Sequence, residues 1–215
     1  MNSLPILILL GSVACFCAGG QTNIIPANGT AVRSVETIVC IRHGEKPQGG
    51  LGQLTCRGLN RALALPDVLL AKYGEPQFVF APNPTQKTEG NGVYFYIRPL
   101  MTIEPTAVRF GLPVNTQFAY QEIKGLEKEL QKKQYQNATV FVAWEHVFLD
   151  AFAKNLVLTN GGSPEQVPPW EENDYDTIFL VRVTHSGAHK SVVFSIAHEG
   201  LDHLSDTCPA IPKDN

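Results

Sequence analysis

The sequence predicts an α/β fold, a three-layer α/β/α sandwich with a mostly parallel central sheet. Short apolar and β-branched runs such as Thr37–Ile41 and Thr139–Trp144 are typical of strands buried on both faces of a sheet. Amphipathic segments with the helical period alternate with these runs, which favours helices on both faces of one sheet. The chain has 215 residues, of which 44% are hydrophobic, and this suits one α/β domain better than two.

The first strand is expected at Thr37–Ile41, and the polar segment Arg42–Pro47 ends it. A glycine-rich loop follows at Gln48–Gln53. The first helix is expected to open at Thr55, because a threonine hydroxyl can accept a hydrogen bond from a free N–H of the first turn. Pro66 lies inside this helix and is expected to kink or interrupt it.

The later elements are expected, in chain order, as a strand at Phe78–Phe80, helices at Arg98–Phe110 and Glu122–Gln134, a strand at Thr139–Trp144, a helix at His146–Leu158 and a hairpin of Thr177–Val183 and Ser191–Ile196. Ligands of such folds gather at the carboxyl ends of the strands. Arg42-His43 and Glu145-His146 each follow a predicted strand. We therefore expect the functional site where these two pairs meet.

The N-terminal segment is expected to be a processing signal. Leu4–Ala18 carries no charge and ends in small residues, and it is shorter than the roughly 20 residues of a membrane span. This pattern fits a cleaved signal peptide. Two alternatives stay open: Ser12–Cys15 resembles the bacterial lipoprotein box, so that lipidation of Cys15 would give membrane attachment, or the segment is a buried helix of the domain.

The expected organisation is a signal peptide or lipoprotein leader over residues 1–20, a tether over 21–35 and one domain over 36–215, exported to the periplasm or secreted. Three cysteines lie beyond the leader. Cys40 sits in an apolar run and is expected to be a buried thiol. Cys56 and Cys208 lie in polar, turn-rich sequence and are expected to pair in an oxidising compartment.

The overall charge excludes some partners. The formal net charge is −3, the isoelectric point is about 6.1, and no block of like charge occurs. Nothing in this pattern makes a basic face for nucleic acid. An anionic substrate would have to be held by a few individually placed cations.

The tripeptide Arg42-His43-Gly44 carries the clearest chemistry. A neutral imidazole is a nucleophile, and an adjacent guanidinium disfavours its protonation through repulsion of like charges. Arginine also binds two phosphate oxygens at once, and glycine permits close approach of the backbone to a ligand. Nucleophile, anion clamp and open backbone together predict phosphoryl transfer at His43.

The stretch Ile38–Leu65 resembles the opening of histidine phosphatase superfamily proteins, which are also called phosphoglycerate mutase-like. In that family an RHG motif ends the first strand and a Thr-x-x-Gly segment opens the next helix, and the closest likeness is to members with RHGEKP. The resemblance extends more thinly over most of the chain. It implies a layered histidine phosphatase-like fold, a phosphohistidine intermediate, a small phosphorylated substrate, and neither metal nor cofactor.

The resemblance also implies roles for individual residues. His43 would be the phosphoacceptor, and Arg42 would contact the phosphate. The family's second phosphate-binding arginine lies on a helix ahead of a Gly-Leu-Pro turn, and Arg98 matches it better than Arg109 does. His146 matches the second histidine, which completes the phosphate pocket.

The sequence also departs from the family pattern. Many members have Ser-Pro-x-x-Arg where this chain has Ala81–Gln86, and here the second arginine comes only after an insertion at Thr88–Tyr96. The proton donor is therefore open, with Glu145 as the first choice and Glu122 as the second. Lys46 is expected either to touch phosphate or to be solvated.

The other polar residues considered are expected to have no role in the site. Solvent exposure is the expectation for Arg57, Arg61, His185 and His189, and a polar loop for His198–His203. The sequence as a whole predicts a phosphomonoesterase. The alternatives are a non-catalytic module that binds a phosphorylated ligand on the same fold and, less favoured in an exported protein, a mutase.

Overall fold

The computed structural model describes residues 33–210, so the predicted leader and most of the predicted tether lie outside the described residues. The first strand begins at Arg33, so the folded domain starts before residue 36, where it was predicted to begin. The strands are β1 (Arg33–Arg42), β2 (Phe78–Phe80), β3 (Gln86–Glu89), β4 (Gly92–Phe95), β5 (Val114–Asn115), β6 (Thr139–Trp144), β7 (Thr177–Ser186) and β8 (His189–His198). The α-helices are α1 (Cys56–Tyr73), α2 (Arg98–Arg109), α3 (Ile123–Leu130) and α4 (His146–Thr159), and short 3-10 helices occupy Lys133–Tyr135 and Pro164–Gln166.

Six strands form the central sheet, in the order β5-β2-β6-β1-β7-β8. Strands β5, β2, β6 and β1 pair in parallel, whereas β7 is antiparallel to both of its neighbours. Within this sheet β7 therefore runs against the other strands, and the prediction of a mostly parallel sheet is confirmed. The remaining two strands, β3 and β4, form a separate antiparallel hairpin, which is called the inserted hairpin below.

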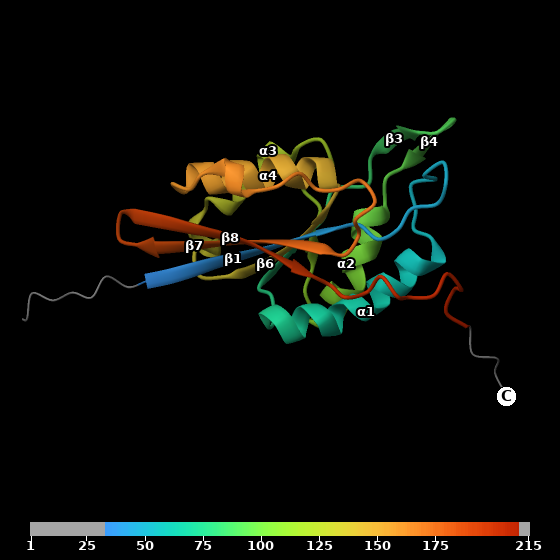
Figure 1. Ribbon diagram of the computed structural model, residues 1–215, viewed down its shortest axis with the longest axis horizontal. Coiled ribbons are helices and arrows are strands. Elements are labelled where there is room, and N and C mark those ends of the chain that lie inside the picture. Colours follow the sequence, from blue (N-terminus) through green and yellow to red (C-terminus); the bar gives the residue numbers. More distant parts are fainter. Residues whose placement is uncertain (1–32, 211–215) are drawn as a thin grey trace, which may run out of the picture. The chain divides into compact units, whose positions relative to one another are not determined.

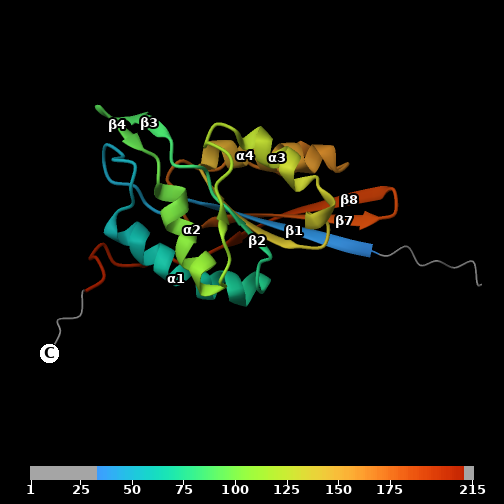
Figure 2. The same cartoon turned by 180° about the vertical axis from the view of Figure 1, so that it is seen from behind.

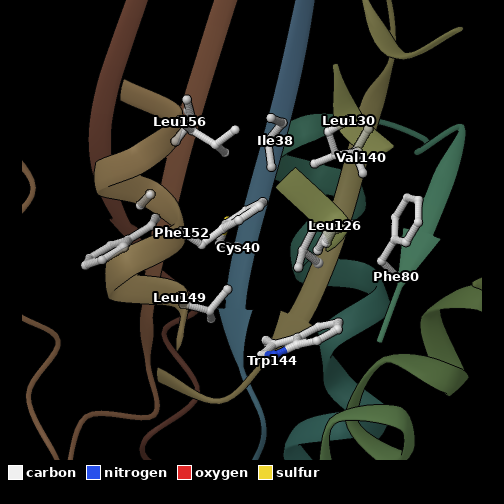
Figure 3. Close-up of a cluster of buried hydrophobic side chains, with 14 of the residues drawn as sticks. Ile38, Cys40, Phe80, Leu126, Leu130, Val140, Trp144, Leu149, Phe152 and Leu156 are labelled. Atoms are coloured by element: carbon white, nitrogen blue, oxygen red, sulfur yellow. The ribbon is translucent and has the colours of Figure 1, made fainter. Parts of the chain in front are cut away.

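Helices cover both faces of the sheet, with α1 and α2 on one side and α3 and α4 on the other (Figure 1; Figure 2). Successive side chains of β1 point to opposite faces of the sheet, as in any β-strand. Ile38 and Cys40 pack in the cluster under α3 and α4 (Figure 3), while Val39 and Ile41 pack under α1 and α2. All four side chains are almost fully buried, and the burial of an isoleucine or valine side chain contributes about 1.5–3 kcal/mol to folding.

The register of β1 and β6 brings their carboxyl ends together. Arg42 lies opposite Trp144, and the backbone N–H of His43 donates to the carbonyl oxygen of Trp144 at 3.0 Å. Because the two strands are parallel, the residues that follow them leave the sheet at the same edge. This places Arg42-His43 beside Glu145-His146, as expected.

Several elements differ from the expectations. Helix α1 runs through Pro66 without interruption, and α3 ends at Leu130 rather than Gln134. The insertion at Thr88–Tyr96, for which no element was predicted, supplies strand β4 and the end of β3. The hairpin of β7 and β8 is longer than predicted because its strands continue beyond the buried apolar residues.

The cysteine predictions are confirmed. Cys56 and Cys208 form a disulfide with their Cα atoms 4.5 Å apart, and it ties the C-terminal segment to the start of α1. Cys40 is a buried free thiol whose pKa is raised by burial. In the described part of the chain, no helix has the length and apolar character that crossing a bilayer requires.

Candidate active site

The loop after β1 is held against the start of α1 by a close contact of two glycines. A Cβ on Gly44 would lie 3.0 Å from the Cα of Gly58, and a Cβ on Gly58 would lie 2.7 Å from the carbonyl oxygen of Glu45. Thr55 caps α1 by accepting the N–H of Gly58 at 3.1 Å, and its own N–H donates to the Glu45 carbonyl at 2.9 Å. The Thr-x-x-Gly segment thus fixes the backbone around His43.

His43 is a buried, neutral imidazole. Its side chain is 2% exposed, and its Nδ1 lies 2.7 Å from the carbonyl oxygen of Gly44. A carbonyl only accepts, so Nδ1 carries the hydrogen and Nε2 keeps its lone pair. Burial lowers the pKa of His43 well below its usual value, and the positive charges of Arg98 and Arg42 lower it further. The imidazole is therefore a nucleophile at neutral pH.

Arg42 is fully buried at the end of β1 and is anchored through one nitrogen. Its Nη1 donates to the backbone carbonyls of Glu172 at 2.5 Å and Asp174 at 2.9 Å. The guanidinium lies over the ring of Tyr175, 4.0 Å from the centroid. Burial lowers the pKa of Arg42, but an arginine stays charged at any physiological pH. Its Nε is buried and has no hydrogen-bond partner in residues 33–210.

Arg98, the first residue of α2, is 1% exposed and is anchored by the inserted hairpin. Its Nη1 donates to Oε2 of Glu89 at 2.7 Å and to the carbonyl of Gly50 at 3.2 Å, while Nη2 donates to the second Glu89 oxygen. Burial acts to lower the pKa of Arg98, but the hydrogen bonds that Arg98 donates to Glu89 outweigh burial and raise that pKa. The Nε of Arg98 is buried and unpartnered within the described chain.

Helix α2 is tied directly to the RHG loop. The N–H of Gly44 donates to the hydroxyl of Thr102 at 2.9 Å, and that hydroxyl donates to the carbonyl of Arg98 at 2.8 Å. The ring of Tyr96 lies beside both groups, 5.9 Å from the His43 ring and 4.6 Å from the Arg98 guanidinium. His43 and Arg98 therefore belong to one rigid cluster.

The first residues of α4 complete the cluster. His146 opens the helix, and burial together with the Arg42 charge lowers its pKa to about 4. Its Nδ1 is buried without a hydrogen-bond partner among the described residues. Glu145 precedes it, and both of its carboxylate oxygens accept from Lys87 at 2.7 Å. Lys87, which was not predicted as a site residue, comes from strand β3 of the hairpin.

A pocket of about 500 Å³ opens beside this cluster, and it is lined by Lys46, Pro47, Gln48, Gly49, Gly50, Lys87, Glu89, Gly90 and Tyr175. Lys46 is exposed at its rim. Arg109 is not among the lining residues. It lies eleven positions along α2 from Arg98, or roughly 16 Å, and pairs with Asp67 at 3.0 Å. Glu122 is exposed and accepts the N–H of Ala119, so it does not line the pocket.

Arg61 was expected in solvent, and that expectation is wrong. It is 0% exposed on α1, where it contacts four carboxylates, namely those of Glu45, Asp176, Glu199 and Asp202, at 2.6–3.3 Å. Burial is the main cause that raises the pKa of Glu199 to about 8, against the opposing charge of Arg61. Because Glu45 directly follows the RHG motif, this ion network supports the back of the site.

One further expectation of solvation, that for His185, is wrong. His185 is 8% exposed on β7, with its Nε2 3.6 Å from a carboxylate oxygen of Glu36. The segment 199–203 forms the predicted loop after β8, but Glu199 within it is only 4% exposed. In residues 33–210 no group of three or more His, Cys, Asp or Glu side chains is placed to hold a metal ion.

No protein-family model and no curated protein matches the sequence of this chain. Solved structures do match it. One is a protein of Nakamurella multipartitia named as the phosphohistidine phosphatase SixA, with a TM-score of 0.53 and 16% identity over 77% of this chain and 96% of its own. Another is a phosphoglycerate mutase of Plasmodium falciparum, with a TM-score of 0.50 and 11% identity over 83% of this chain and 99% of its own. A third is a mycobacterial hydrolase, with a TM-score of 0.50 and 12% identity over 84% and 94% of the two chains. The chain thus has the fold of the histidine phosphatase superfamily, as its RHG segment implied.

Proposed function

We propose that this protein is a phosphomonoesterase in which His43 is transiently phosphorylated. One observation carries the proposal: a neutral, buried imidazole lies in one cluster with two buried arginines. Each arginine is anchored through Nη1 and has an Nε that finds no hydrogen-bond partner within residues 33–210. A buried donor without a partner costs free energy, which a bound anion would recover. Phosphate suits this arrangement because an arginine can bind two of its oxygens through adjacent N–H groups.

The electrostatics also favour an anion. Arg42 and Arg98 both lower the pKa of His43, so two positive charges act on the space around the imidazole. The Nδ1 of His146 adds another buried nitrogen that has no hydrogen-bond partner in the part of the chain that the structure describes. Preorganised donors of this kind stabilise the negative charge of a phosphoryl group during its transfer. In the proposed mechanism these side chains take the place that a metal ion has in other phosphoryl-transfer enzymes.

In the first step, Nε2 of His43 attacks phosphorus and the bond from phosphorus to the leaving oxygen breaks. The leaving oxygen takes a proton from a carboxylic acid and departs as an alcohol. The Nδ1–H of the phosphorylated imidazole keeps its hydrogen bond to Gly44, which stabilises the positive charge on the ring. In the second step, water attacks phosphorus, the carboxylate takes a proton from it, and inorganic phosphate and neutral His43 are released.

Glu145 is the proposed proton donor and acceptor. Its ion pair with Lys87 favours the ionised form, which is the form that accepts a proton from water in the second step. The first step needs the protonated form. A bound phosphoryl group promotes protonation of Glu145, because its negative charge repels the Glu145 carboxylate and attracts Lys87 away from Glu145.

The same ion pair favours a second candidate function. If Lys87 keeps Glu145 ionised throughout, the site binds a phosphorylated ligand without turning it over. Phosphate binding without hydrolysis would then be observed. The two functions share the arginine clamp and differ only in turnover.

Export of the protein is a separate proposal. The uncharged segment Leu4–Ala18 supports it, and the disulfide of Cys56 and Cys208 is a bond typical of oxidising compartments. Mass spectrometry of the mature protein tests this directly. We expect an N-terminus near Gln21, or a lipidated Cys15, whereas an intact Met1 in a cytosolic protein would contradict it.

The proposed activity is tested by hydrolysis of 4-nitrophenyl phosphate in the presence of a chelator. We expect turnover by the purified protein that the chelator does not change and that inorganic phosphate inhibits competitively. Phosphate binding without turnover would favour the binding module. Neither binding nor turnover would contradict both functions.

A further inference from the structure

The inserted hairpin places two charged residues of its inner face on the site. Lys87 and Glu89 are two residues apart on β3, so their side chains point to the same side of the hairpin. Lys87 pairs with Glu145, and Glu89 pairs with Arg98. Each hairpin residue therefore contacts a site residue of opposite charge.

The contact with Glu89 leaves a defined part of Arg98 uncovered. A guanidinium has five N–H groups, and the carboxylate of Glu89 and the carbonyl of Gly50 accept three of them. The acceptors take both Nη1–H groups and the Nη2–H that faces Nη1. The two that remain, Nε–H and the adjacent Nη2–H, form the side edge of the guanidinium, which matches two oxygens of one phosphoryl group.

We propose that Glu89 is a positioning residue, which holds the Arg98 guanidinium so that its side edge faces the phosphoryl group of the substrate. This inference rests on the proposed function and adds a residue to it. Glu89 itself does not touch the reacting atoms. It acts by fixing the rotation of Arg98, as a carboxylate fixes the orientation of a catalytic group elsewhere.

Burial gives the pair its rigidity. The side chains of Arg98 and Glu89 are 1% and 9% exposed, and the N–H of Gly52 also donates to Glu89 at 3.3 Å. The hydrogen bonds and charge of Arg98 lower the pKa of Glu89, although burial acts to raise it. The carboxylate therefore remains ionised, and the guanidinium cannot rotate without breaking two charge-assisted hydrogen bonds.

The opposite interpretation is that Glu89 competes with the substrate for Arg98. A carboxylate that blocked the arginine would have to leave before phosphate could bind, and its removal would then tighten phosphate binding. The two interpretations predict changes of opposite sign. The side edge left uncovered on Arg98 favours the positioning role.

The test compares Glu89→Gln with wild type in two measurements, steady-state hydrolysis of 4-nitrophenyl phosphate and calorimetric binding of inorganic phosphate. Glutamine keeps the size of the side chain but cannot accept both guanidinium hydrogens. We expect kcat to fall by about tenfold or more and the Kd for phosphate to rise. Glu104→Gln, which removes the same charge from the exposed side of α2, should change neither value by more than about twofold.

A double-mutant cycle shows whether Glu89 acts through Arg98. In an Arg98→Ala background, Glu89→Gln should change kcat by less than about twofold, because the group it positions is gone. If Glu89→Gln does not fold, Glu89→Asp takes its place, since it keeps the charge and shortens the reach. We expect an intermediate loss from Glu89→Asp.

Three outcomes would overturn the inference. These are tighter phosphate binding by Glu89→Gln, unchanged kcat and Kd, or a full loss that persists without Arg98. Each of them leaves the proposed phosphatase function intact if the wild type is active. Wild-type protein that neither binds phosphate nor hydrolyses the ester would remove the proposed function and the role of Glu89 together.

Discussion

The Nδ1 atom of His43 lies 2.7 Å from the carbonyl oxygen of Gly44, in the loop that directly follows β1. This hydrogen bond assigns the hydrogen of the neutral ring to Nδ1 and leaves the lone pair on Nε2, the proposed nucleophile. The loop cannot shift easily, because Gly44 and Gly58 are in contact and the N–H of Gly44 is bound to Thr102. The backbone therefore selects the reactive tautomer.

The tautomer is open to direct measurement. Burial and the two arginines lower the pKa of His43, so the ring should stay neutral and protonated on Nδ1 at pH values at which an ordinary histidine is already charged. Long-range 15N imidazole spectra of the phosphate-free protein would show this, with His43→Asn to assign the signals. A ring that is protonated on Nε2, or that is charged at pH 6.5, would contradict the account.

The two arginines of α2 should differ in their effect on catalysis. Arg98→Ala removes a buried clamp and should lower kcat by about 10²-fold or more. Arg109→Ala removes a half-exposed residue that pairs with Asp67, and it should change kcat by less than about twofold. Steady-state kinetics of both variants decide the matter. The reverse ranking would place the second phosphate clamp at the other end of the helix.

The role of Glu145 depends on the leaving group. Glu145→Gln should slow an alkyl phosphate by about 10²-fold, since an alkoxide needs a proton to depart. It should slow 4-nitrophenyl phosphate much less, because that phenolate leaves without a proton. An equal loss on both esters, measured as kcat, would indicate that Glu145 serves only to hold Lys87 and His146.

Arg61 should be important for the stability of the fold, whereas Arg57 on the same helix should not. Arg61→Met leaves buried carboxylates without their cation and should lower the free energy of unfolding by about 3–5 kcal/mol. Arg57→Met breaks an ion pair with the exposed Asp206 and should cost less than about 1 kcal/mol. Urea titrations of the two variants provide the comparison. Similar small losses would show that the Arg61 network contributes little.

Local patterns were sufficient for most of the scaffold. Strand β1, helix α1 with its Thr55 cap, and strand β6 follow from runs of neighbouring residues, and the parallel pairing of β1 and β6 follows from the fold class. The meeting of His43 with His146 was predicted on the same grounds. Their roles in the reaction remain predictions.

Ion pairs between residues far apart in the sequence could not be predicted from local patterns. Arg61 contacts carboxylates at positions 45, 176, 199 and 202, and no periodicity links these positions. Strand β3 is polar throughout, so the pattern of Gln86–Glu89 did not predict a strand, and the contacts of Lys87 and Glu89 with the site were missed with it. The general expectation that isolated charges are solvated fails where a fold assembles opposite charges from distant segments.

The most direct test of the central claim is a rapid acid-free quench of the wild-type protein during hydrolysis of a 32P-labelled phosphomonoester. We expect protein-bound label that is stable to alkali and labile to acid, and that maps to the peptide containing His43. His43→Ala should carry no label and should lose more activity than the roughly 10² to 10⁴ of a single acid–base group. Label on another residue, or a His43→Ala protein that keeps most of its activity, would contradict the account.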